Sequence, residues 1–390
     1  MTTACPACRA DGLQGFHLVE GVPTNSCLLL DDAESARTFP TGRLDLAFCG
    51  VCGFITNRAF EPTLAEYSSR YEETQSFSPR FVDFARGLAS RWVERYALHG
   101  SRVLEVGCGK GEFLVWMVEA GVAGGVGIDP GVHPERLDGD AAARVEWIAD
   151  FYDERYAALE FDALVCRHTL EHIHSVGDFL QMVRKNIGDA DPVVLFELPD
   201  TARVLREVAF WDTYYEHCSY FSAGSLARLF RLSGFEVLDI HYDFDNQYLL
   251  LEARPNGSRS HNPLPIEEDV RTVAELVQHF QDSYRKVIAK WVKRLDSLRA
   301  RGGRIALWGG GSKAVAFLSV PQLRDKVDVI VDINPHKQGR YIAGTEHEVV
   351  APTVLTEVLP ELVIVANPIY VAEVHQDLSD MGLTCELTSL

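Results

Sequence analysis

The 390-residue chain lacks any apolar run long enough to span a bilayer, and its first residues, MTTACPAC, have neither the basic nor the apolar stretch of a secretory signal. Basic side chains are outnumbered, because 37 Lys and Arg face 56 Asp and Glu and leave a formal net charge of -19. A field of this sign repels polyphosphate backbones. We therefore expect a cytoplasmic protein with no membrane anchor and no nucleic-acid partner.

The nine cysteines are expected to be reduced thiols or metal ligands, because a disulfide framework does not persist in the cytoplasm. Four of them form two Cys-x-x-Cys pairs, Cys5 with Cys8 and Cys49 with Cys52. Each pair directs two thiolates to one side of a tight turn, so the two pairs predict a tetrahedral structural zinc site, with redox or incidental pairs as the alternative. The long separation between the pairs requires an inserted hairpin or loop.

Helical and strand patterns alternate after this cysteine-containing block. Apolar residues at helical spacing over 81–98 are followed by a strand at 103–106, a glycine turn at 107–111, a helix at 112–120 and a strand that ends at Asp129. This order predicts the first half of a doubly wound α/β sheet. The glycines let the backbone pass close to a ligand, and Asp129 can accept hydrogen bonds from both hydroxyls of a ribose.

The glycine spacing decides which adenosine cofactor the turn fits. Gly107, Gly109 and Gly111 follow Glu105 and do not form the Gly-x-Gly-x-x-Gly order that seats a pyrophosphate. The pattern resembles motif I of the class I S-adenosylmethionine methyltransferases rather than an NAD site. This resemblance implies a set of cofactor-binding residues: Glu105, Gly107, Gly109, Gly111, Asp129, Asp150, Phe151 and His168.

Two of these positions follow later strands of the same fold. Asp150 and Phe151 match the adenine-edge contact after the third strand, and His168 ends a fourth strand over 161–168, where it would face cofactor or substrate. We expect Glu171 and His172 to cap and brace the next helix.

A polar aromatic segment follows, over 210–222. Its simplest interpretation is a packed hairpin. However, Tyr214-Tyr215-Glu216-His217, followed by Phe-Ser and preceded by a strand that ends Phe-Glu-x-Pro, resembles the deoxysugar C-methyltransferases of the D-mycarose and D-tetronitrose type, which act at the 3-position of keto-sugar nucleotides. The likeness spans essentially the whole chain.

This resemblance implies roles for four residues. His217 would take the proton next to a ketone, since an imidazole accepts protons near neutrality. Glu216 would orient the base or bind the sugar, and Tyr214 would stabilise the enolate oxygen. The family also contributes an N-terminal tyrosine, for which Tyr71 is the closest match and Tyr67 the second.

Other functions compete with this interpretation. The same residues are compatible with an O- or C-methyltransferase of a non-sugar metabolite. A zinc-bearing RNA methyltransferase is disfavoured by the charge, and a binding module with an inactive turn is disfavoured because the glycines, Asp129 and His217 are intact.

The last block begins with apolar residues at gaps of three and four from 270 to 298, which predict one long amphipathic helix. The helix packs along its own domains or forms a coiled coil, so we expect a monomer or a homodimer. Strands near 304–308, 327–332 and 361–367 predict a second sheet. Its turn offers Gly309, Gly311, Ser312 and Lys313 to the diphosphate of a sugar-nucleotide substrate, unless this domain is only a scaffold.

With 47% hydrophobic residues, the chain can bury a large core and exceeds one ordinary domain. We predict an α/β protein with a class I methyltransferase Rossmann-like doubly wound sheet, an N-terminal zinc-binding module and a smaller Rossmann-like C-terminal domain. The predicted boundaries are 1–80 for the zinc-binding domain, 81–253 for the methyltransferase domain, 254–300 for a linker with the long helix, and 301–390 for the C-terminal domain.

Overall fold

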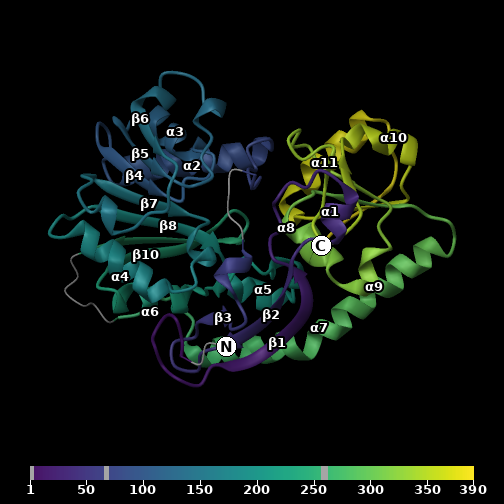
Figure 1. The fold of residues 1–390 in the computed structure, drawn as a ribbon, viewed down its shortest axis with the longest axis horizontal. Helices are drawn as coiled ribbons and strands as arrows, with labels where there is room; N and C mark the ends of the chain where they lie inside the picture. Colours follow the sequence, from purple (N-terminus) through teal and green to yellow (C-terminus); the bar gives the residue numbers. More distant parts are fainter. Residues whose placement is uncertain (1–3, 66–69, 256–261) are drawn as a thin grey trace.

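The computed structural model describes residues 4–65, 70–255 and 262–390, and these residues form three β-sheets (Figure 1). The strand orders are β1-β2-β3-β9, β10-β11-β8-β7-β4-β5-β6 and β14-β15-β13-β12-β16-β17. No helix in the described ranges combines the length and the apolar character that a bilayer crossing requires. Tyr67 lies outside the described residues.

The first sheet is antiparallel and contains a strand from far along the chain. β1 (Gln14–Pro23) and β2 (Thr41–Phe48) form a hairpin between the two cysteine pairs, with the short helix α1 (Ala33–Arg37) in their connection. β3 (Ile55–Asn57) pairs with β2 on one side and with β9 (Ser219–Tyr220) on the other. The 210–222 segment is therefore no local hairpin, because it adds a strand to the N-terminal sheet.

The seven-stranded sheet is the predicted doubly wound core. Its parallel strands are β4 (Arg102–Val106), β5 (Gly124–Ile128), β6 (Val145–Ile148), β7 (Ala163–Arg167) and β8 (Val193–Pro199). β11 (Tyr248–Arg254) runs antiparallel between β8 and β10 (Glu236–Asp243), so β10 has the same direction as the parallel strands. Neighbouring residues of β4 enter separate cores, since Val103 packs with α2 and α3 while Leu104 packs with α4 and α6. This alternation shows that helices cover both faces.

The α-helices that the structure describes in this part are α2 (Pro79–Arg95), α3 (Glu112–Glu119), α4 (Val176–Ile187), α5 (Thr201–Glu207) and α6 (Ala223–Leu232). Two of them, α2 and α3, begin and end near the positions predicted at 81–98 and 112–120. α2 starts where Ser78 accepts a hydrogen bond from the Phe81 amide and Pro79 occupies the first turn, a sequence that favours a helix start.

The third sheet has the same parallel character on a smaller scale. Its strands are β12 (Ile305–Trp308), β13 (Val329–Val331), β14 (Arg340–Tyr341), β15 (Glu348–Val350), β16 (Leu362–Val365) and β17 (Glu386–Ser389), and only β14 pairs antiparallel within this sheet. Its helices are α8 (Ser312–Leu318), α9 (Pro321–Arg324), α10 (Leu355–Val358) and α11 (Val371–Asp380).

The long helix α7 (Val270–Arg299) runs along the molecule beside β1 and α5 and leads into the third sheet (Figure 1). Val273, Val277 and Phe280 are buried near its start, and Leu295 and Leu298 near its end. All five belong to one core that also contains residues of β2, α5 and β12. The apolar stripe therefore packs on its own chain.

Candidate active site

A cavity of about 750 Å³ lies where the glycine turn after β4 faces the glycine turn after β12. The carboxyl ends of parallel strands are where doubly wound sheets bind ligands. The predicted residues that line this cavity are Tyr71, Glu105, Gly107, Gly109, Asp129, Asp150, Phe151, His168, Tyr214, Glu216, His217, Gly309, Gly311, Ser312 and Lys313. Gly111 is not among the lining residues, because it caps α3 and is covered by Leu137 and Trp147.

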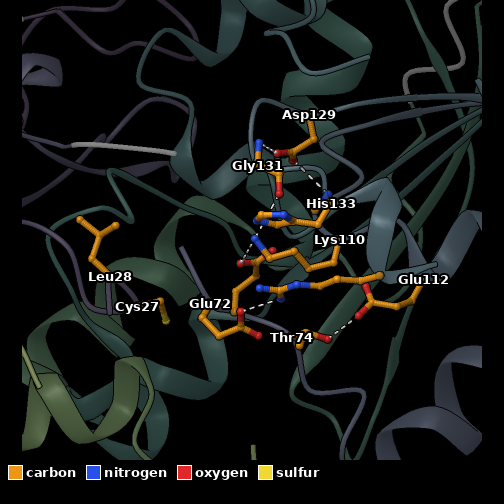
Figure 2. A network of polar contacts seen from close by, with 12 residues as sticks. Cys27, Leu28, Glu72, Thr74, Lys110, Glu112, Asp129, Gly131 and His133 are labelled. Atoms are coloured by element: carbon orange, nitrogen blue, oxygen red, sulfur yellow. Dashed lines mark hydrogen bonds and ion pairs between the residues drawn. The ribbon is translucent and has the colours of Figure 1, made fainter. Parts of the chain in front are cut away.

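The first turn has a backbone that only glycine adopts easily. Gly107 has a φ of +70°, and a Cβ there would come within 2.0 Å of the Thr169 hydroxyl oxygen. Asp129 supports the turn from the end of β5, since its carboxylate accepts the Gly109 amide at 3.0 Å. It also accepts the Gly131 amide at 2.6 Å (Figure 2). A carboxylate is also an acceptor suited to ribose hydroxyls.

Glu105 lies in the wall of this cofactor end of the cavity. Its Oε2 atom is buried and accepts no hydrogen bond from any described residue. Burial raises the pKa of this carboxyl to about 8, although the positive charge of Arg167 opposes the shift. An unsatisfied buried carboxylate oxygen fits a ligand that brings a positive charge, such as the amino group of S-adenosylmethionine.

His168 has a left-handed backbone with a φ of +48° and stands between two carboxylates. Its Nε2 is 2.9 Å from Glu197 and its Nδ1 is 3.5 Å from Glu171. Burial lowers the pKa of this imidazole, but the two carboxylates outweigh burial and raise the pKa to about 9. At neutral pH the ring is therefore a cation with both nitrogens occupied, so it borders the cavity without being free to accept a proton.

His217 has the opposite character. It is only 8% exposed, and its ring centroid lies 4.3 Å from that of Tyr214 and 4.7 Å from that of His172. Burial, together with the charges of His172, His168 and Lys313, holds its pKa well below the usual value. The imidazole is therefore neutral at physiological pH and can accept a proton.

Glu216 joins three distant parts of the chain. Its Oε1 accepts the backbone amide of Ser26 at 2.9 Å and a second hydrogen bond from the Ser26 hydroxyl, which is also 2.7 Å from the Ser312 hydroxyl. Burial raises the pKa of Glu216 to about 7 against these hydrogen bonds. Ser26 was not predicted, because no motif surrounds it and only the folded chain brings it to Glu216.

The prediction for Glu171 and His172 was wrong. Both lie in a 3-10 helix over Leu170–His172, and the start of α4 receives no side-chain cap. They line the cavity instead, where the His172 ring is perpendicular to the His217 ring and 6.5 Å from the ring of Tyr71. In sequence, polar residues that cap a helix are hard to distinguish from a loop that carries polar residues into a site.

The second turn is supported in the same manner as the first. Asp332, at the end of β13, accepts the Gly310 amide and the Asn334 amide, each at 2.8 Å. Lys313 is ion-paired with Asp212, and the buried Lys337 lies 3.5 Å from Asp332. Lys337 was missed because it lies in a loop without a motif.

The four predicted cysteine ligands are together and away from the cavity. Cys5 Sγ is 3.7 Å from Cys52 Sγ, Cys8 Sγ is 3.7 Å from Cys49 Sγ, and all four sulfur atoms lie within 4.8 Å of one another. Four converging thiols are a donor set that suits zinc.

Comparisons with known proteins agree with this architecture. Residues 81–240 match a methyltransferase domain family, and residues 261–383 match the C-methyltransferase C-terminal domain family. C-methyltransferase NovU of Streptomyces niveus is 27% identical over 338 residues, covering 83% of this chain and 79% of NovU.

Solved structures also resemble parts of the chain. One is the Burkholderia thailandensis 1,6-didemethyltoxoflavin-N1-methyltransferase, with 18% identity, 46% of this chain and 82% of that chain covered, and a TM-score of 0.34. Another is a SAM-dependent methyltransferase of Aquifex aeolicus, with 14% identity, coverages of 46% and 95%, and a TM-score of 0.35.

The doubly wound sheet, the first glycine turn and the matched domains define a class I S-adenosylmethionine-dependent methyltransferase. Within that class, the chain is a C-methyltransferase, in which a C-methyltransferase C-terminal domain follows the methyltransferase domain and which is similar to NovU.

Proposed function

We propose that this C-methyltransferase removes a proton from the carbon next to the ketone of a nucleotide-linked keto-deoxysugar and methylates the resulting enolate. The observation that carries the proposal is the neutral, buried imidazole of His217 in a cavity bounded by two nucleotide-type turns. One turn suits the cofactor and the other suits the diphosphate of a substrate, so the sugar would lie between them, against His217.

The side chains around His217 support carbon deprotonation. When bound, S-adenosylmethionine supplies an electrophilic methyl group. His217 would accept the proton from carbon, and the Tyr214 hydroxyl would donate a hydrogen bond to the enolate oxygen. Burial raises the pKa of Tyr214 well above its usual value, so the hydroxyl keeps its proton. The Tyr220 hydroxyl donates to the Tyr214 carbonyl at 3.1 Å and holds this segment in place.

Hydrogen exchange separates this function from its alternatives. A keto-deoxysugar nucleotide incubated in deuterated water with the enzyme and S-adenosylhomocysteine should gain deuterium at the carbon next to the ketone, measured by NMR. A His217→Asn variant that still binds S-adenosylhomocysteine should not support the exchange. Methylation of an oxygen atom, or exchange that persists in the variant, contradicts the proposal. A panel of such sugars with labelled methyl donor then identifies the substrate.

We also propose that Cys5, Cys8, Cys49 and Cys52 hold one structural Zn²⁺. The distances between their sulfur atoms support a four-thiolate site with no open position for chemistry. Metal analysis of the purified protein should find one zinc per chain, and a Cys49→Ser/Cys52→Ser variant should lose it. Folded wild-type protein without zinc would contradict this assignment.

A further inference from the structure

A segment of the N-terminal part crosses the cavity between the two glycine turns. We call residues 71–78 the strap. On the methyltransferase side, the Thr74 hydroxyl donates to Glu112 at 2.8 Å (Figure 2). On the C-terminal side, the Tyr370 hydroxyl donates to the Gln75 side chain at 2.6 Å. The strap is thus tied to both walls.

Glu72 fixes the direction of the strap. Its carboxylate accepts from Arg136 at 2.9 Å and from the Asn334 side chain at 3.1 Å, and its amide donates to the Cys27 carbonyl at 2.9 Å. The residue is 1% exposed, and each of its two carboxylate oxygens accepts a hydrogen bond within the protein. Glu73, the next residue, is therefore held at the cofactor end.

Glu73 occupies space that the glycine turn leaves open. Its Oε1 lies 2.9 Å from the point where a Cβ on Gly109 would stand. Its Oε2 is buried and accepts no hydrogen bond from a described residue, and its ion pair with Lys110 is long, at 3.7 Å. Lys110 is also engaged elsewhere, since it donates to the Gly131 carbonyl at 3.1 Å (Figure 2).

The charges around Glu73 favour a cationic ligand. Burial raises its pKa to about 8, Lys110 opposes this shift, and the neighbouring carboxylates Asp129 and Glu112 add to it. A further positive charge in the cavity would relieve this repulsion. The methyl donor carries such a charge on its sulfur, whereas the demethylated product does not.

The position of Glu73 along the strap indicates which part of the cofactor it meets. Tyr71, two residues earlier, lies beside His172, which stands against His217. The strap therefore leads from the side of the proposed base, at Tyr71, to the glycine turn, at Glu73. The motif implies that Asp129 contacts the ribose and that Glu105 faces the amino group of the cofactor.

We propose that Glu73 contacts the sulfonium centre of S-adenosylmethionine and makes the enzyme bind the methyl donor more tightly than the product S-adenosylhomocysteine. The carboxylate loses its partner once the methyl group has left, so the same contact favours product release. This inference rests on the cofactor and not on the identity of the sugar substrate.

Binding measurements test the proposal without turnover. Isothermal titration calorimetry would compare wild type, Glu73→Gln and the matched control Glu61→Gln, an exposed carboxylate outside the cavity lining. The ligands are S-adenosylmethionine, sinefungin, which carries an amine in place of the sulfonium, and S-adenosylhomocysteine. In Glu73→Gln we expect Kd to rise about tenfold for the two ligands charged at this centre and less than about threefold for S-adenosylhomocysteine.

Two results overturn the proposal: unchanged affinities, or the same loss for all three ligands. A Glu73→Asp variant keeps the charge but withdraws it by one methylene, so its preference for the charged ligands should lie between wild type and Glu73→Gln. This graded preference distinguishes an electrostatic contact from general damage, which circular dichroism would report. Because no sugar is present, either outcome leaves the proposed C-methylation to be judged by its own exchange experiment.

Discussion

In both glycine turns of this protein an aspartate accepts hydrogen bonds from two backbone amides, but the charged side chains around the turns differ. After β5, Asp129 accepts the amides of Gly109 and Gly131, and after β13, Asp332 accepts the amides of Gly310 and Asn334. The balance of charge differs, because Lys110 lies among several carboxylates at the first turn, whereas each of two lysines at the second turn faces one aspartate. Carboxylates surround the first turn (Glu73, Glu105 and Glu112), whereas lysines flank the second (Lys313 and Lys337). The glycine turns thus determine where a ligand binds, and the charged side chains beside each turn determine whether a cationic or an anionic ligand is favoured.

The turns also differ in how their charges are balanced. Glu73 and Glu105 each have a carboxylate oxygen without a hydrogen-bond donor among the described residues. Lys313 and Lys337 both have carboxylate partners, Asp212 and Asp332. The first turn is therefore prepared for a cationic group, while an anion at the second turn must share lysines that are already paired.

The largest effect is expected from His217, which belongs to neither turn. His217→Asn removes the proposed base, so methyl transfer should fall by a factor of about 10² to 10⁴. Calorimetry should find unchanged affinity for S-adenosylhomocysteine and for a nucleoside diphosphate, since both turns are intact. The exposed His99→Asn serves as control. Turnover in His217→Asn within tenfold of wild type would contradict the assignment.

Removal of the proposed zinc should produce the next largest effect. β3 begins three residues after Cys52 and pairs with β9, which begins two residues after His217. In addition, the Asn57 amide and the Thr56 hydroxyl donate to the Cys218 carbonyl at 3.0 and 2.8 Å. Loss of the metal would displace the base, and a shift of about 1 Å costs turnover about a hundredfold.

The first turn should be insensitive to this treatment, because β4 and β5 carry it. We therefore expect chelated protein to bind S-adenosylhomocysteine within about twofold of the zinc-loaded form. Full recovery of turnover on adding zinc back is the control. Parallel loss of cofactor binding and turnover would show global unfolding instead.

Matched substitutions of the two aspartates test whether the turns act separately. Asp129→Asn replaces a charged acceptor of two amides, so affinity for S-adenosylhomocysteine should fall about 10- to 100-fold. Asp332→Asn makes the same change at the second turn and should weaken only nucleoside diphosphate binding. Both affinities are measured by calorimetry. If either variant weakens both ligands equally, the turns are not independent sites.

We expect the smallest effect from pH, which should change ligand affinity at the two turns in different ways. Because the pKa of Glu73 is raised to about 8, its carboxyl loses its proton as the pH rises through 8, and only the ionised form attracts a cation. Between pH 6.5 and 8.5, the ratio of the methyl-donor Kd in Glu73→Gln to that in wild type should rise by up to about tenfold. The use of a ratio cancels any titration of the ligand itself.

At the second turn the corresponding Kd ratio should not rise with pH. Burial lowers the pKa of Lys313 despite the attraction of Asp212, so rising pH can only remove positive charge there. The ratio of nucleoside diphosphate Kd in Lys313→Gln to that in wild type should therefore stay constant or fall over the same range. A rising ratio at Lys313, or a constant one at Glu73, would contradict the contrast between the turns.

Local patterns were sufficient to predict the elements that hold the turns. Strands such as β4 and β12 are continuous apolar runs followed by glycine, and α7 repeats apolar residues at gaps of three and four over 30 residues. The convergence of Tyr71, His217 and Lys313 on one cavity was implied by the family resemblance alone, because periodicity does not place distant segments together.

Contacts between distant segments were not predictable from the sequence. β9 has two residues, too few for a periodic signal, and it joins β3 across more than 160 positions. The hydrogen bonds from Ser26 to Glu216 and the approach of Glu73 to Gly109 likewise depend on the folded chain. The balance of charges at a site can be worked out only when the residues that fold next to each other are known.

The continuous helix α7 constrains how the cavity exchanges its contents. At 1.5 Å per residue, its 30 residues form a rod of about 45 Å. Its first half is anchored on β1 and α5 and its last turns on the third sheet. A rod without an internal proline or glycine resists kinking, so the spacing between its anchored ends is preserved during the catalytic cycle. Exchange of ligands in the cavity therefore leaves the spacing between β1 and the third sheet unchanged.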